Sequence, residues 1–294
     1  MTKRRIHVLI NPASGQPQPI LNTLNSVFHP LGIDWEVFIT KESGDAERLA
    51  RQAAAAGVDV LAAYGGDGTV MEAARGLFGS QTPLAILPGG TANLMSVELG
   101  IPKDLAQAAA LAADPNSQTR RVDAGLFGGK THFLLRVGLG FAARKVEIAD
   151  RDLKDRYGVM AYSIGALKAL GVAEQAHYHL TLDGESYETQ GFTCLVDNAG
   201  NIGFAGLGLK SIRVDDGLLD VIIVRDARLR SWIAVGAGVS GAQLNPEYIQ
   251  HWQAREITIE ADPPQPVQMD GELAGQTPVS IKVVPGLVRI LAPA

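Results

Sequence analysis

The feature that most constrains this sequence is a regular alternation of strand-like and helix-like patterns over residues 1–124. Short apolar runs that end near glycine, asparagine or proline are each followed by a stretch with helical spacing. This alternation predicts parallel strands joined by crossover helices, and therefore an α/β sheet covered on both faces. The predicted strands are Ile6–Ile10, Trp35–Thr40, Val58–Tyr64 and Leu84–Leu87, and the predicted helices are Ile20–Leu31, Asp45–Ala56 and Lys103–Ala113.

The pattern changes near residue 125, and short strand-like runs bounded by Gly, Asp-Gly or Pro-Gly turns dominate residues 125–294. Asp183-Gly184 lies between two alternating runs and predicts a hairpin. Helical patches interrupt the strands at Tyr157–Leu170 and Arg228–Val239. We therefore expect an α/β domain over residues 1–124 and a mostly antiparallel β domain over 125–294, with the last residues packing back on the first domain. The predicted strands are Thr131–Val137, Tyr178–Leu182, Phe192–Val196, Leu219–Val224, Glu256–Glu260, Val279–Val284 and Leu287–Leu291.

Composition narrows the class of protein. Of the 294 residues, 46% are hydrophobic and 19% are charged, which is typical of a globular protein. The formal net charge of −5 gives no overall attraction to nucleic acid. Cys194 is the single cysteine and lies in an apolar run, so we expect a buried thiol in a reducing compartment.

No segment of the sequence predicts secretion or a membrane span. The apolar run before Pro12 is too short for a signal-peptide core. The long uncharged run Gly76–Val97 contains Pro83 and Pro88, which are unfavourable in a membrane-spanning helix. The expected location is therefore the cytoplasm.

A glycine-rich segment, Gly65–Thr69 (the second loop), stands between a predicted strand and a predicted helix. Such glycines let main-chain N–H groups approach a phosphate, whose charge the helix N-terminus favours. A carboxylate beside phosphates is repulsive unless a cation lies between them, so Asp67 predicts a magnesium-linked role. The alternative is structural: Thr69 and Glu72 fit a capping box that starts a helix, and aspartate is common in turns.

Two further loops favour the phosphate interpretation. Asn11–Gly15 (the first loop) and Pro88–Asn93 (the third loop) each follow a predicted strand. Because the carboxyl ends of parallel strands meet at one edge of a sheet, where ligands bind, we expect all three loops to gather there. Three glycine-rich loops together predict a polyphosphate site.

Taken in order, five motifs resemble those of the diacylglycerol kinase catalytic-domain family. They are N-P-x-S-G, G-G-D-G-T, P-x-G-T-x-N, Asp215–Asp220 (DDGLLD) and Met269–Glu272 (MDGE). The resemblance is greatest to its bacterial soluble lipid kinases, which are related to sphingosine kinases and more distantly to NAD kinases. It implies an α/β nucleotide-binding domain, a β-sandwich-like C-terminal domain and an active site in the cleft between them. It also implies ATP and Mg²⁺ as cofactors and transfer of the γ-phosphoryl group to a lipid hydroxyl.

The resemblance also assigns residues. A magnesium ion would be held by the carboxylate of Asp216 and the main-chain carbonyls of Arg213 and Leu218. The catalytic base would be Asp270 or, as second choice, Glu272, with Asp67 as a further catalytic residue. Without the resemblance, each Asp-Gly pair would be interpreted as a plain turn, the second with an exposed glutamate. The nucleotide would contact Asn11, Pro12, Ala13, Ser14, Gly15, Thr40, Gly65, Gly66, Asp67, Gly68, Thr69, Val70, Met71, Glu72, Gly90, Thr91 and Asn93.

One position departs from the family pattern. Many bacterial relatives carry an aspartate after the asparagine of the third loop, and this chain carries Leu94. Two alternatives therefore stay open: a nucleotide-binding regulator without kinase turnover, and an NAD kinase-like or other small-molecule kinase. The expected partners are a lipid with a free hydroxyl and, transiently, the inner membrane surface, with no nucleic acid. A homodimer is left open.

Overall fold

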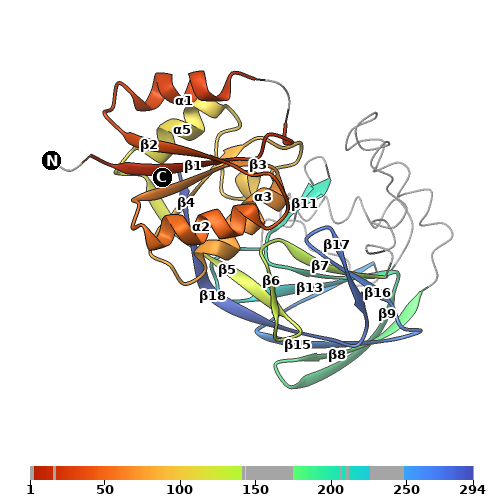
Figure 1. Ribbon diagram of the computed structural model, residues 1–294. Coiled ribbons are helices and arrows are strands. Elements are labelled where there is room, and N and C mark those ends of the chain that lie inside the picture. Colours follow the sequence, from red (N-terminus) through yellow and green to blue (C-terminus); the bar gives the residue numbers. More distant parts are fainter. Residues whose placement is uncertain are drawn as a thin grey trace. The chain divides into compact units, whose positions relative to one another are not determined.

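The structure, a computed structural model, describes residues 3–15, 18–140, 143, 175–204, 207–208, 212–225 and 248–293. The helical patches predicted at Tyr157–Leu170 and Arg228–Val239 lie outside these residues. The chain divides into two compact units (Figure 1). Unit 1 contains Met1–Val122 and Gly286–Ala294, and unit 2 contains Asp123–Pro285.

Unit 1 is an α/β unit around a parallel sheet. Its strands β1 (Arg5–Ile10), β2 (Asp34–Ile39), β3 (Val60–Gly65) and β4 (Leu84–Pro88) lie in the order β2-β1-β3-β4, and every neighbouring pair is parallel. The predicted parallel sheet is therefore confirmed. The helices are α1 (Ile20–Phe28), α2 (Asp45–Ala55), α3 (Asp67–Leu77), α4 (Leu94–Glu98) and α5 (Leu105–Ala113).

The helices cover both faces of this sheet, with α1 and α5 on one face and α2 and α3 on the other (Figure 1). Strands β3 and β4 are buried at every residue, as continuous apolar runs in a covered parallel sheet require. Small residues bring α2 and α3 close together, since a Cβ on Gly76 would lie 2.6 Å from the Cβ of Ala50. The chain order reverses between β1 and β3, which is where open parallel sheets bind ligands.

Unit 2 is an antiparallel sandwich. One sheet has the order β14-β13-β10-β7-β16-β17, and the other contains β18, β15, β8 and β9, with β5 and β6 joined through β18. The inner faces of both sheets contribute to one core, for example Tyr178 and Ile259 from one and Cys194 and Val221 from the other. Burial also raises the pKa of the Cys194 thiol. The strands are β5 (Gln118–Phe127), β6 (Thr131–Phe133), β7 (Arg136–Gly140), β8 (Ala176–Leu182), β9 (Glu185–Gly191), β10 (Thr193–Asp197), β13 (Leu219–Val224), β14 (Ile249–Ala254), β15 (Glu256–Asp262), β16 (Pro266–Met269), β17 (Glu272–Gln276) and β18 (Val279–Ala292), besides a short pair, β11 (Asn201–Phe204) and β12 (Leu207–Gly208).

The hairpin predicted at Asp183-Gly184 is confirmed, since Leu182 of β8 pairs with Glu185 of β9. The turn predicted at Pro285-Gly286 is wrong, because β18 continues through both residues. Within this strand the pairing partner changes, from β15 along Val279–Lys282 to β4 at Ile290. Among the described residues, no helix is long and apolar enough to cross a membrane.

Candidate active site

The three glycine-rich loops meet at the carboxyl edge of the unit 1 sheet. The Asn11 side chain donates a hydrogen bond from Nδ2 to Thr69 Oγ1 at 2.9 Å, which joins the first loop to the second. The N–H of Gly89 donates to the carbonyl of Gly65 at 2.9 Å, which joins the third loop to the second. The expected gathering of the loops is therefore present within unit 1.

Glycine is required where these loops touch. A Cβ on Gly90 would lie 2.6 Å from the Cα of Gly66, and one on Gly15 would lie 2.1 Å from the carbonyl oxygen of Gly89. Both distances are too short for any side chain, so these glycines permit close packing of main chain against main chain. Beneath them lies Tyr64, which is fully buried and whose hydroxyl accepts a hydrogen bond from Gln18 at 2.6 Å.

Asp67 links the second loop to the start of helix α4. Its Oδ1 accepts a hydrogen bond from the N–H of Leu94 at 2.6 Å. Burial raises the pKa of this carboxyl, while the main-chain N–H groups of Leu94, Asn93 and Met95 oppose the rise. Asn93 has a positive φ of 49° and closes the third loop by two side-chain hydrogen bonds to Gly90, at 3.0 and 2.6 Å. The acid among the glycines therefore fastens two loops together.

The capping-box interpretation of Thr69 and Glu72 is wrong. Helix α3 already begins at Asp67, and no side-chain hydrogen bond caps its N-terminus. Thr69 accepts from Asn11 instead, and the Glu72 carboxylate accepts from Ser43 Oγ at 3.1 Å and from the Gly44 N–H at 3.0 Å. Both side chains therefore connect neighbouring loops.

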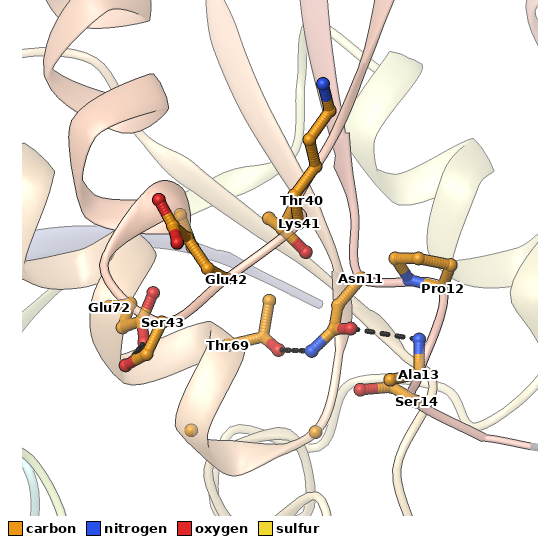
Figure 2. A pocket seen from close by; sticks show the side chains of 13 residues that line it. Asn11, Pro12, Ala13, Ser14, Thr40, Lys41, Glu42, Ser43, Thr69 and Glu72 are labelled. Atoms are coloured by element: carbon orange, nitrogen blue, oxygen red, sulfur yellow. Dashed lines mark hydrogen bonds between the residues drawn. The ribbon is translucent and has the colours of Figure 1, made fainter.

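A cavity of about 450 Å³ opens at these loops, which is within the range of small-molecule sites (Figure 2). Among the predicted nucleotide residues, it is lined by Asn11, Pro12, Ala13, Ser14, Thr40, Gly66, Gly68, Thr69 and Glu72. The other predicted residues do not line the cavity. Val70 and Met71 are buried in helix α3. The remaining ones lie in the three loops, away from the cavity surface: Gly15, Gly65, Asp67, Gly90, Thr91 and Asn93.

Four lining residues were not predicted: Lys41, Glu42, Ser43 and Ala46. They follow β2, which lies directly beside β1 in the sheet. No glycine pattern marks this segment, and only the rule that every parallel strand ends at the ligand edge could have indicated it. Thr40, which the resemblance assigned, is the last residue before this segment.

In unit 2, the Asp270-Gly271 pair forms the turn between β16 and β17, with positive φ at both residues. The Asp270 carboxylate accepts three main-chain hydrogen bonds, from Leu134 at 3.0 Å, Leu135 at 3.1 Å and Arg136 at 2.9 Å. Burial raises the pKa of Asp270, although these three donors act in the opposite direction. Glu272, two residues later, is exposed. The two acids of this motif therefore have different surroundings.

The residues assigned to magnesium lie in the turn before β13. Asp216 Oδ1 accepts from the N–H of Leu218 at 3.0 Å, and the Arg213 side chain pairs with Asp215 at 3.1 Å. Burial raises the pKa of Asp216, and the nearby carboxylates of Asp220 and Asp123 raise it further. Within the described part of the chain, no three acidic, histidine or cysteine side chains form a metal cluster. One carboxylate with main-chain carbonyls, in a negative environment, nevertheless suits Mg²⁺.

Residues 5–127 match the diacylglycerol kinase catalytic domain, and residues 136–292 match the YegS C-terminal NAD kinase beta sandwich-like domain. The chain belongs to the diacylglycerol kinase catalytic-domain family. Its membership confirms the resemblance that the five motifs indicated, and it makes the chain a kinase.

Individual relatives match over nearly the full length of this chain. An uncharacterized protein of Synechocystis sp. is 30% identical over 306 residues, covering 98% of this chain and 70% of the relative. A diacylglycerol kinase of Bacillus subtilis is 27% identical over 282 residues, covering 94% and 92%. A crystal structure of a diacylglycerol kinase from Bacillus anthracis str. Sterne has a TM-score of 0.75 at 27% identity, with 99% and 98% covered. The α/β unit followed by a β sandwich is thus shared with kinases of this family.

Proposed function

We propose that this protein is an ATP- and Mg²⁺-dependent lipid kinase that transfers the γ-phosphoryl group of ATP to a lipid hydroxyl. The observation that carries the proposal is the meeting of three glycine-rich loops, the first and second of which line a cavity, in a chain of the diacylglycerol kinase family. The lipid character of the acceptor is supported by the family and by the name of the Bacillus subtilis relative.

The cavity suits a nucleotide triphosphate. Gly66, Gly68 and Thr69 stand at the start of helix α3, where unpaired main-chain N–H groups and the helix dipole favour a phosphate. Ala13 and Ser14 of the first loop line the same space. We assign the phosphates to this end of the cavity, and we keep for Asp67 the role of ordering them through the metal.

Of the two acids in the D-G-E motif, we assign the base to Glu272. A general base must reach the hydroxyl proton that it accepts. The Asp270 carboxylate already accepts three main-chain hydrogen bonds, whereas the Glu272 carboxylate is exposed. Asp270 then holds the turn, and Glu272 would accept the proton of the lipid hydroxyl during phosphoryl transfer.

Asp216, with the carbonyls of Arg213 and Leu218, would hold Mg²⁺, whose charge would offset the neighbouring carboxylates of Asp220 and Asp123. When bound, magnesium in such kinases supplies neutralisation of negative charge. The protein groups do the positioning: the first and second loops hold the phosphates, and Glu272 holds the acceptor oxygen.

The test is transfer of ³²P from γ-labelled Mg-ATP to mixed micelles containing diacylglycerol, monoacylglycerol, phosphatidylglycerol, a sphingoid base or a polyprenol, with ATP binding measured in parallel. We expect label in one lipid class, and its loss when EDTA removes the metal. Label that persists in EDTA would overturn the magnesium assignment. ATP binding without label in any lipid would favour the nucleotide-binding regulator, and label in a soluble acceptor would favour a small-molecule kinase.

A further inference from the structure

The segment after β2, Lys41–Ser43, forms a wall of the cavity with a different character from the glycine loops. It brings two charged side chains, those of Lys41 and Glu42, to the cavity, where the lining residues of the first loop are all uncharged. Figure 2 shows Glu42 on one side of the cavity, and Ala13 and Ser14 on the other. Glu42 therefore lies away from the part of the first loop to which we assigned phosphate binding.

Two carboxylates fix the main chain of this wall. Asp45 Oδ2 accepts from the N–H of Lys41 at 2.9 Å and from that of Glu42 at 3.3 Å. Arg48 and these N–H groups lower the pKa of Asp45 to about 2, so it stays ionised. Glu72 holds the next two residues through Ser43 Oγ and the Gly44 N–H. The wall is therefore built in advance of any ligand.

Glu42 is the carboxylate of this wall that is left for a ligand. Within the ranges that the structure describes, no donor lies within hydrogen-bonding distance of its side chain, whereas Asp45 and Glu72 are both occupied. A carboxylate beside a polyphosphate site lowers the affinity for the negatively charged ligand, unless the carboxylate faces uncharged hydrogen-bond donors of that ligand. In a nucleotide, the ribose hydroxyls are such donors.

The place of Glu42 in the sheet leads to the same part of the ligand. β2 is the neighbour of β1, and the first loop after β1 belongs to the assigned phosphate site. In open parallel sheets that bind dinucleotides, an acid near the end of the next strand accepts the ribose 2′-hydroxyl. Glu42 comes three residues after the last residue of β2, Ile39.

We propose that Glu42 accepts hydrogen bonds from the ribose hydroxyls and makes the site selective for ribonucleotides over 2′-deoxyribonucleotides. This inference rests on the proposed nucleotide site, and it adds a specificity-determining residue to it. Glu42 lies on the side of the cavity away from Ala13 and Ser14, so the ribose would face the wall while the phosphates face the first loop.

The test is the ratio of the dissociation constants of 2′-deoxyATP and ATP, measured on the full chain without lipid. A hydrogen bond to a charged group corresponds to about tenfold or more in affinity, so we expect the wild type to bind ATP at least about tenfold more tightly. Glu42→Gln should bring the ratio close to one. Glu36→Gln removes the same charge from an exposed position of β2 that does not line the cavity, and should leave the ratio unchanged.

Three outcomes would overturn the assignment. The first is that the wild type binds both nucleotides equally, and the second is that Glu42→Gln keeps the wild-type ratio. The third is that Glu72→Gln abolishes the preference while Glu42→Gln does not, which would assign the ribose to Glu72. Each of these leaves ATP binding, and so the proposed function, intact. A wild type that binds neither nucleotide would instead overturn the nucleotide site itself, and the role of Glu42 with it.

Discussion

Gly66-Asp67-Gly68 in unit 1 and Asp270-Gly271-Glu272 in unit 2 look alike in sequence, yet they differ in what they offer a ligand. The first opens helix α3, and its two glycines line the cavity. The second is a tight hairpin turn that presents an exposed glutamate. In both, the aspartate accepts hydrogen bonds from main-chain N–H groups of another segment.

The comparison teaches that an acid beside glycines is not by itself the reacting group. Asp67 and Asp270 both fasten loops, and the groups that would touch the phosphates and the acceptor hydroxyl directly are their neighbours. In unit 1 those neighbours are main-chain groups, so an added Cβ should do more harm than a changed side chain. In unit 2 the neighbour is the Glu272 side chain, and there a change of a few atoms should be decisive. Each of the following variants tests one side of this contrast.

Glu272→Gln should have the largest effect. Removing a general base lowers turnover by about 10²- to 10⁴-fold, and an exposed substitution leaves stability within about 0.5 kcal/mol. The measurement is the rate of label transfer at saturating ATP, together with the melting temperature. Glu260→Gln, also exposed in unit 2, is the matched control and should retain wild-type turnover. Normal turnover in Glu272→Gln would return the assignment of the base to Asp270.

Gly90→Ala should come next. Its Cβ would meet the Cα of Gly66 at 2.6 Å, so the second and third loops must separate. We expect a loss of about 1–3 kcal/mol in the free energy of unfolding, which is the usual cost of overpacking, and weaker ATP binding by about tenfold. In Gly68→Ala the added Cβ meets nothing within 4 Å, so that variant should unfold no more easily than wild type. Equal stability of the two variants would contradict the contact between the loops.

Asp270→Asn should act on stability more than on chemistry. An amide keeps one acceptor oxygen but places an N–H donor against a main-chain donor at Leu134–Arg136. We expect the free energy of unfolding to fall by about 1–3 kcal/mol. Chemical denaturation measures it, and Glu272→Gln serves as the comparison. If Asp270→Asn kept full stability and lost turnover, the roles assigned to the two acids would be exchanged.

Thr69→Val should have a smaller effect, because it removes one hydrogen bond and keeps the shape of the side chain. Asn11 Nδ2 would lose its acceptor, which costs about 0.5–1.5 kcal/mol. ATP affinity should fall by a similar free energy, since the first and second loops are no longer joined. Thr69→Ser keeps the hydroxyl and should bind ATP like wild type. Isothermal titration would show the difference, and equal affinities would mean that the loops stay together without this bond.

The sequence predicted the parallel sheet and the meeting of the glycine loops, because strand periodicity and glycine content are local signals. It could not separate Asp270 from Glu272, since the donors that occupy Asp270 lie more than 130 residues earlier in the chain. It missed Lys41–Ser43, because their place in the cavity follows from the position of β2 in the sheet and from no motif. It also divided β18 at Pro285-Gly286, because the local proline-glycine signal carries no information on the change of partner from β15 to β4 within one long strand.

The smallest expected effect is on the pH dependence of stability, and it concerns Asp67. Its pKa is raised in the folded chain, so the folded state keeps a proton that the unfolded state has already released. The stability that this group contributes is therefore complete below its ordinary pKa and is lost as the pH rises through the folded value. Asp67→Asn cannot ionise and still offers an oxygen to the Leu94 N–H. Its free energy of unfolding, relative to wild type, should rise with pH across this window and then level off. Denaturation at a series of pH values, with Glu36→Gln as a charge control, measures this difference. A difference that falls with pH would mean that the main-chain donors around Asp67 outweigh burial, and that the second loop is held by charge.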